Sequence, residues 1–147
     1  MAEPSSRKVH AVLFTCAMNA IRSPMAEAIA RHYFGKKIYV QSAGIHKGEV
    51  DGFVIAVLDE IGIDVRGHKP HTLEDLVENE GFNFDLIVTL SPEAHHTAME
   101  LTRTLSVEVE YWATIDPSIV EGGREARLDA YRKVRDALQT NILDRLG

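Results

Sequence analysis

Short apolar runs alternate along the chain with segments whose apolar residues recur every three or four positions. The runs cover residues 9–14, 37–42, 84–90 and 107–112. The run at 84–90 is almost continuously apolar, as expected of a strand that is covered on both faces. Strands that alternate with helices predict an α/β fold: three layers, with a central four-stranded parallel sheet and helices on both faces.

Helix signals follow each run. Ser23 is a good N-cap, Pro24 stands where a missing N–H costs nothing, and Gly35 offers a stop, so a helix is predicted between them. Later helical stripes are predicted within 54–61, 91–101 and 131–142. In such a sheet the ligand site is expected beyond the C-terminal ends of the strands, where the first loop lies.

Length and charge narrow the class of protein. The chain has 147 residues, of which 45% are hydrophobic, and no linker long enough to separate domains, so we expect one domain over 1–147 with a flexible N-terminus at 1–8. A net charge of −6 disfavours a nucleic-acid partner. The start lacks a long apolar segment, which predicts a cytoplasmic protein without a membrane span.

The single cysteine opens a loop that ends at a helix start, in the spacing Cys16-x5-Arg22-Ser23. Five intervening residues can wrap so that their backbone N–H groups point inward toward a tetrahedral oxyanion, next to the positive end of the helix. This substrate-binding loop is predicted to comprise Ala17, Met18, Asn19, Ala20, Ile21, Arg22 and Ser23.

Inward N–H groups, the helix end and the guanidinium of Arg22 all favour a thiolate, so we expect a lowered pKa for Cys16. Arg22 can donate two parallel hydrogen bonds to a phosphate. These properties point to nucleophilic chemistry on a phosphate ester. A buried, inert cysteine is the alternative, but it would not explain an arginine at the anion-binding turn.

The loop resembles that of the low-molecular-weight protein tyrosine phosphatase family, and the likeness extends over residues 9–146. Matching positions include Asn19, the helix start 23–27, Ser42-Ala43-Gly44, Gly67-His68 and Asp116-Pro117. The resemblance implies that Cys16 attacks phosphorus to form a thiophosphate intermediate, that Asp116 protonates the leaving oxygen, and that Arg22 binds the phosphoryl group. It also implies that Asn19, Ser23, Ser42 and His68 support the loop, and that no metal or other cofactor is needed.

The implied partners are a phosphorylated protein or a small aryl phosphate, with inorganic phosphate, vanadate or arsenate as ligands of the loop, and no nucleic acid or membrane. Ser118 stands where many phosphotyrosine-cleaving members have an aromatic residue, so a preference for phosphotyrosine is less well supported than phosphatase chemistry. The histidines at 68, 71, 95 and 96 lack cysteine or carboxylate companions at zinc spacing. His71, His95 and His96 are therefore interpreted as surface residues.

Two other functions stay open. The segment 122–136 is similar to arsenate reductases of this fold, and a reductase with one cysteine would have to use an external small-molecule thiol. Met18 stands where the family commonly has glycine, and positive φ there would strain the loop, shift it, or place Met18 in the pocket. A non-catalytic oxyanion-binding or phosphoprotein-binding module is the third hypothesis.

Overall fold

The computed structural model describes residues 8–79 and 82–147; most of the predicted flexible N-terminus, residues 1–7, lies outside them. Its sheet has four parallel strands in the order β2-β1-β3-β4, which confirms the predicted α/β fold. The strands are β1 (Ala11–Met18), β2 (Tyr39–His46), β3 (Leu86–Thr89) and β4 (Glu108–Tyr111).

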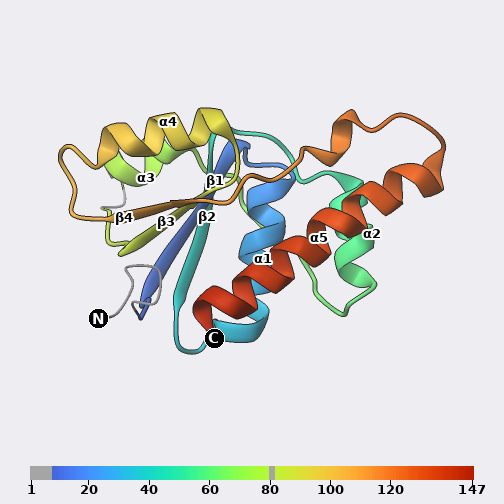
Figure 1. Cartoon of the computed structure of the whole chain (residues 1–147), viewed down its shortest axis with the longest axis horizontal. Helices are drawn as coiled ribbons and strands as arrows, with labels where there is room; N and C mark the ends of the chain where they lie inside the picture. Colours follow the sequence, from blue (N-terminus) through green and yellow to red (C-terminus); the bar gives the residue numbers. More distant parts are fainter. Residues whose placement is uncertain (1–7, 80–81) are drawn as a thin grey trace.

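Helices cover both faces of the sheet (Figure 1). One face carries α1 (Arg22–Phe34), α2 (Gly52–Asp59) and α5 (Arg124–Leu146), and the other carries α3 (Leu73–Asn79) and α4 (Pro92–Leu101). A short 3₁₀ turn, η2 (Pro117–Ile119), precedes α5. In the part of the chain that the structure describes, no helix is both long and apolar enough to cross a membrane.

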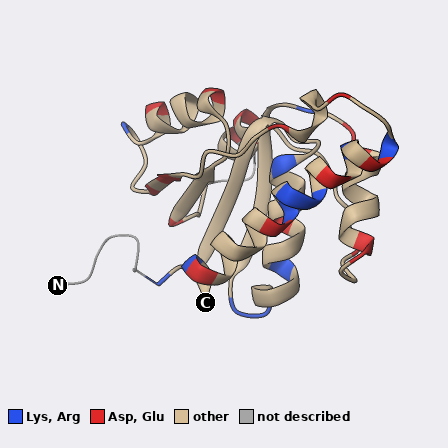
Figure 2. Ribbon diagram, turned by 45° about the vertical axis from the view of Figure 1, so that its right-hand side comes forward, with Lys and Arg blue, Asp and Glu red and all other residues tan. Residues whose placement is uncertain are grey.

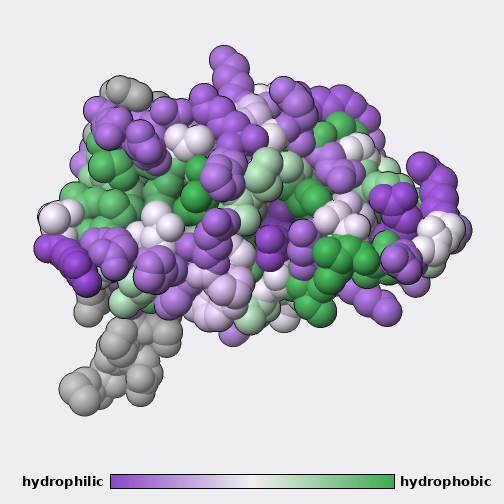
Figure 3. All heavy atoms as spheres, turned by 90° about the horizontal axis from the view of Figure 1, so that it is seen from above, coloured by the Kyte–Doolittle hydropathy of each residue, from purple (hydrophilic) through white to green (hydrophobic). Residues whose placement is uncertain are grey.

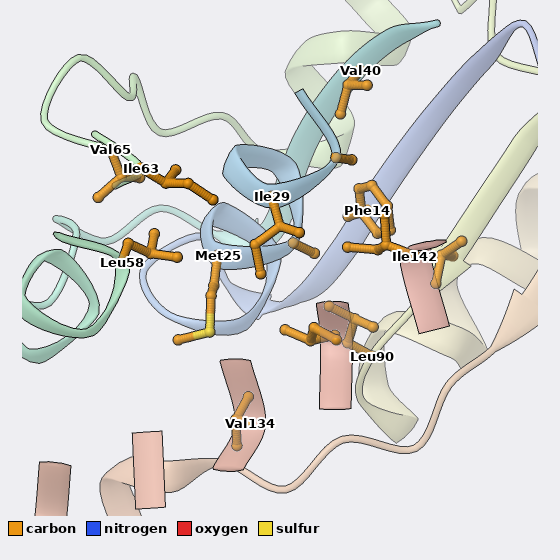
Figure 4. Packing of buried hydrophobic residues seen from close by; sticks show 14 of the residues in the cluster. Phe14, Met25, Ile29, Val40, Leu58, Ile63, Val65, Leu90, Val134 and Ile142 are labelled. Atoms are coloured by element: carbon orange, nitrogen blue, oxygen red, sulfur yellow. The ribbon is translucent and has the colours of Figure 1, made fainter. Parts of the chain in front are cut away.

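Alternation along β1 divides the core in two. Phe14 and Cys16 face the larger cluster, which packs α1, α2 and α5 against the sheet, whereas Leu13 faces the smaller cluster under α3 and α4. Figure 4 shows how Met25 and Ile29 of α1 extend into the larger cluster. The surface seen from above is mostly hydrophilic, with separate hydrophobic patches (Figure 3).

The end of β1 and the start of α1 differ from the prediction in ways that affect the predicted loop. β1 continues to Met18, beyond the predicted end at residue 14, because its last residues pair with β2 as far as His46. α1 begins at Arg22 with Ile21 as N-cap and no side-chain cap, so the prediction that Ser23 caps this helix is wrong. The Ser23 hydroxyl instead bonds to Cys16 and Asn19.

Candidate active site

The predicted site lies at the C-terminal edge of the sheet, where β1 leads into α1. Arg22, the first residue of α1, donates from Nη1 to the carbonyl oxygens of Thr114 (3.0 Å) and Leu90 (3.4 Å). Leu90 directly follows β3, and Thr114 lies in the segment that follows β4. Arg22, which follows β1, therefore connects the C-terminal ends of β1, β3 and β4.

Cys16 is buried, with 1% of its surface exposed, and its sulfur contacts two groups. Sγ lies 2.7 Å from the carbonyl oxygen of Met18, which can accept only from the protonated thiol. Sγ also lies 3.0 Å from the hydroxyl oxygen of Ser23. When the thiol donates its hydrogen to the Met18 carbonyl, the Ser23 hydroxyl can donate to the sulfur.

The expected lowering of the Cys16 pKa is contradicted in this conformation. Burial raises the pKa of the thiol above its ordinary value, and it outweighs the hydrogen bond from Ser23 and the charge of Arg22, which act in the opposite direction. The structure therefore favours the neutral thiol.

Asn19 is the centre of a buried hydrogen-bond network behind the loop. Its Nδ2 donates to the hydroxyls of Ser23 (2.9 Å) and Ser42 (3.1 Å). Its Oδ1 accepts from the backbone N–H of His71 (3.0 Å) and lies 3.0 Å from Nε2 of His68. All the polar valences of this amide are used, which holds its side chain in one orientation.

Glu27 extends this network and was not singled out as a site residue from the sequence. The carboxylate is buried, accepts a hydrogen bond from the Ser42 hydroxyl, and pairs with Arg31 at 3.0 Å. Nδ1 of His68 lies 3.6 Å from the same carboxylate. An acidic residue one helical turn after Ser23, on the buried face of the helix, was the available signal.

The wrapped shape predicted for the loop is absent between Cys16 and Ser23. The chain stays extended through Met18, and the N–H of Asn19 donates to the His46 carbonyl at 3.1 Å, so it does not face an anion site. Among the residues described, no residue other than glycine has positive φ, so Met18 is unstrained. Its side chain is 44% exposed.

Asp116 lies two residues after Thr114, whose carbonyl Arg22 binds. Its Oδ1 accepts from the N–H (2.9 Å) and the hydroxyl (2.7 Å) of Ser118, at the start of η2. Asp116 thus follows the segment that Arg22 binds at the strand edge near Cys16, which spacing along the chain could not show.

Residues 11–144 match the family model described as low molecular weight phosphotyrosine protein phosphatase. The chain belongs to this family. The resemblance found in the sequence is therefore confirmed, and it covers the whole site described above.

Within the family, the chain is similar in sequence to proteins named arsenate reductases. An arsenate reductase of Shouchella clausii is 31% identical over 138 residues, covering 93% of this chain and 94% of that protein. An arsenate reductase of Halalkalibacterium halodurans is 33% identical over 132 residues, covering 89% and 91%.

Solved structures show the same fold. A tyrosine phosphatase of Erwinia amylovora superposes with a TM-score of 0.74 at 19% identity, covering 94% of this chain and 91% of that one. An arsenate reductase in its phosphate-binding state superposes with a TM-score of 0.70 at 26% identity, covering 93% and 96%.

Proposed function

We propose that this family member is a cysteine-dependent phosphatase that hydrolyses phosphomonoesters, among them phosphotyrosine in proteins. The observation that carries the proposal is the contact of the Cys16 sulfur with Ser23, one residue after Arg22 at the start of α1. A hydroxyl donor on sulfur stabilises a thiolate both when it attacks and when it leaves.

The proposed reaction has two steps. The Cys16 thiolate forms a bond to phosphorus while the ester P–O bond breaks, and Asp116 gives its proton to the leaving oxygen. Water then attacks phosphorus, the S–P bond breaks, and Asp116 accepts the proton of the water. Arg22 holds the phosphoryl oxygens, while Asn19, Ser42 and His68 keep Ser23 and the loop in position.

The conformation described above is a resting one in this proposal. A thiolate cannot donate to the Met18 carbonyl, so loss of the thiol proton removes that contact. Arg22 must also exchange its carbonyl partners for phosphoryl oxygens. Oxyanion binding therefore accompanies a turn of the Met18 peptide that directs backbone N–H groups toward the anion, as in a loop that binds phosphate.

Arsenate reduction is the second candidate, because curated relatives across about nine-tenths of the chain bear that name. Cys16 is the chain's single cysteine, so an internal disulfide relay is impossible and the reduction would need an external thiol. The phosphatase hypothesis requires no such second reactant.

The deciding experiment measures aryl phosphate hydrolysis and thiol-dependent arsenate reduction side by side, with vanadate as inhibitor. We expect hydrolysis by the wild type, none by Cys16→Ser, and retained phosphate binding by that variant. Reduction without hydrolysis would reject the phosphatase in favour of the reductase, and oxyanion binding with neither activity would favour the binding module.

A second variant tests whether Asp116 is the general acid. Asp116→Ala should slow hydrolysis of phenyl phosphate far more than that of esters whose leaving groups are strongly acidic, since the latter need little protonation. An equal loss for both substrates would reject Asp116 as the acid.

A further inference from the structure

Three arginines lack a carboxylate partner among the residues that the structure describes. In that part of the chain, the other arginines each pair with an acidic side chain: these are Arg31, Arg66, Arg103, Arg132, Arg135 and Arg145. The remaining three are Arg22 at the start of α1 and Arg124 and Arg127 at the start of α5. In a chain with a net charge of −6, Arg124 and Arg127 thus place two guanidinium charges without a carboxylate partner three residues apart at the start of α5.

Phe53 holds Arg124 and Arg127 beside α2. The guanidinium carbon of Arg127 lies 4.8 Å from the centre of the Phe53 ring, and that of Arg124 lies 5.6 Å from it. Arg124 also lines a hollow of about 290 Å³ together with Asp51, Gly52 and Phe53. Figure 2 shows basic residues at the first turn of α5, next to α2.

This pair is connected through Asp51 to the segment between Cys16 and Ser23. The N–H of Asp51 donates to the carbonyl of Ala20 at 3.1 Å, and its Oδ2 accepts from the Tyr131 hydroxyl at 3.0 Å. Burial and then Asp51 raise the pKa of Tyr131; Asp116 raises it further, while Arg127 lowers it. Tyr131 thus lies within electrostatic reach of both Asp116 and Arg127.

We propose that Arg124 and Arg127 bind carboxylates of a phosphorylated peptide, so that the substrate is a phosphoprotein segment with Asp or Glu near the phosphorylated residue. This inference rests on the proposed phosphatase function. The stacked guanidinium groups are already positioned, and each can bind a carboxylate through two parallel hydrogen bonds.

The surroundings favour a short acidic segment over a polyanionic surface. Glu121 precedes the pair in the chain, Glu125 lies between its two arginines, and both glutamates are exposed. Their charges would repel a membrane or a nucleic acid, which bring dense negative charge, more strongly than a peptide with one or two carboxylates.

The test compares two phosphotyrosine peptides that differ only in carrying Glu or Gln around the phosphorylated residue. For the wild type we expect kcat/KM to be about fivefold higher for the Glu peptide at low ionic strength, the size of two exposed ion pairs, and this ratio to fall in high salt. The double variant Arg124→Gln/Arg127→Gln should bring the ratio close to one, and Arg124→Lys/Arg127→Lys should keep most of it. Arg103→Gln, which removes an exposed arginine on the opposite side of the sheet, should leave the ratio unchanged.

A wild-type ratio of one, or a ratio that survives the double Gln variant, overturns the inference. Hydrolysis of a small aryl phosphate reports separately on the proposed function. If the wild type lacks that activity, affinities of the Cys16→Ser variant for the same two peptides decide the question without turnover. Equal affinities then reject the inference, and a preference for the Glu peptide that is lost in the arginine variants supports it.

Discussion

Thr15 and Cys16 are neighbours in β1 whose side chains lie on opposite faces of the sheet. Cys16 contacts the Ser23 hydroxyl, whereas the fully buried Oγ1 of Thr15 has no hydrogen-bond partner in the described part of the chain. A buried hydroxyl without a partner costs free energy that an apolar group of the same shape would not. Thr15 thus lowers the free energy of unfolding, and it lies directly beside Cys16, the predicted nucleophile.

Thr15→Val should therefore raise the free energy of unfolding by about 1 kcal/mol. The matched control is Thr89→Val, because the equally buried Thr89 hydroxyl bonds to His95 at 2.9 Å and its loss should be destabilising. Urea denaturation of both variants measures the two changes. A destabilised Thr15→Val protein would show that the hydroxyl has a partner after all.

The raised pKa of Cys16 predicts how this thiol reacts when no anion is bound. The rate of alkylation by iodoacetamide should climb with pH from neutrality to beyond the ordinary thiol value of 9.0, because burial disfavours the thiolate. Cys16 is the single cysteine, so the total rate reports on it alone. A plateau already below neutral pH would mean that the loop holds a thiolate without substrate.

At the scale of elements, the contact between the segment that follows Cys16 and β2 depends on Gly44. A Cβ at this position would collide with the backbone of Asn19 and of His46, which are hydrogen-bonded to each other. Asn19 in turn bonds to Ser23, so a shift of the loop backbone would move the hydroxyl that contacts the sulfur.

Gly44→Ala should accordingly destabilise the protein by about 2 kcal/mol or more and lower the affinity for phosphate or vanadate, measured by thermal unfolding and by calorimetry. Gly52→Ala is the control: a Cβ at Gly52, the first residue of α2, meets no other atom within 4 Å. That variant should be neutral or slightly stabilising. Unchanged anion affinity in Gly44→Ala would contradict the role assigned to this close approach.

At the scale of the whole molecule, a cluster of charges attaches α5 to the end of α2. Glu60 accepts from Arg132 at 2.8 Å and from Arg135 at 2.8 Å, and Arg135, which is 8% exposed, also donates to the Val57 carbonyl. Hydrogen bonds from Arg132 are the main cause that lowers the pKa of Glu60 to about 2. These contacts join segments more than seventy residues apart.

Because folding favours the ionised form of Glu60, its contribution to stability is complete above its ordinary pKa of 4.5 and is lost as the pH falls toward 2. Glu60→Gln should lower the free energy of unfolding by about 1 kcal/mol at neutral pH, a value kept small because water screens this partly exposed group. The deficit relative to the wild type should disappear between these two pH values. Glu100→Gln, which removes an exposed pair with Arg103, should show a smaller loss. Denaturant unfolding from neutral to acidic pH measures all three proteins.

The sequence by itself determined the α/β class, the position of the strands, and the spacing from Cys16 to Arg22 and Ser23, because hydrophobic periodicity and helix-start chemistry are local properties. It also excluded an internal disulfide relay, since one cysteine cannot supply two thiols. The prediction that Ser23 caps α1 was wrong because tertiary contacts overrode a local signal. The Ser23 hydroxyl bonds to Asn19 and Cys16 instead of capping the helix.

The tertiary structure alone decided which groups meet at the loop. Asn19 bonds to Ser42 and to His71, and Arg22 binds a carbonyl ninety-two residues away, contacts that depend on how separate strands align at one edge of the sheet. The same alignment keeps Met18 extended and buries the Cys16 sulfur, which reverses the expected direction of its pKa. Burial and hydrogen-bond partners are properties of packed segments, so the spacing of residues along one segment could not reveal them.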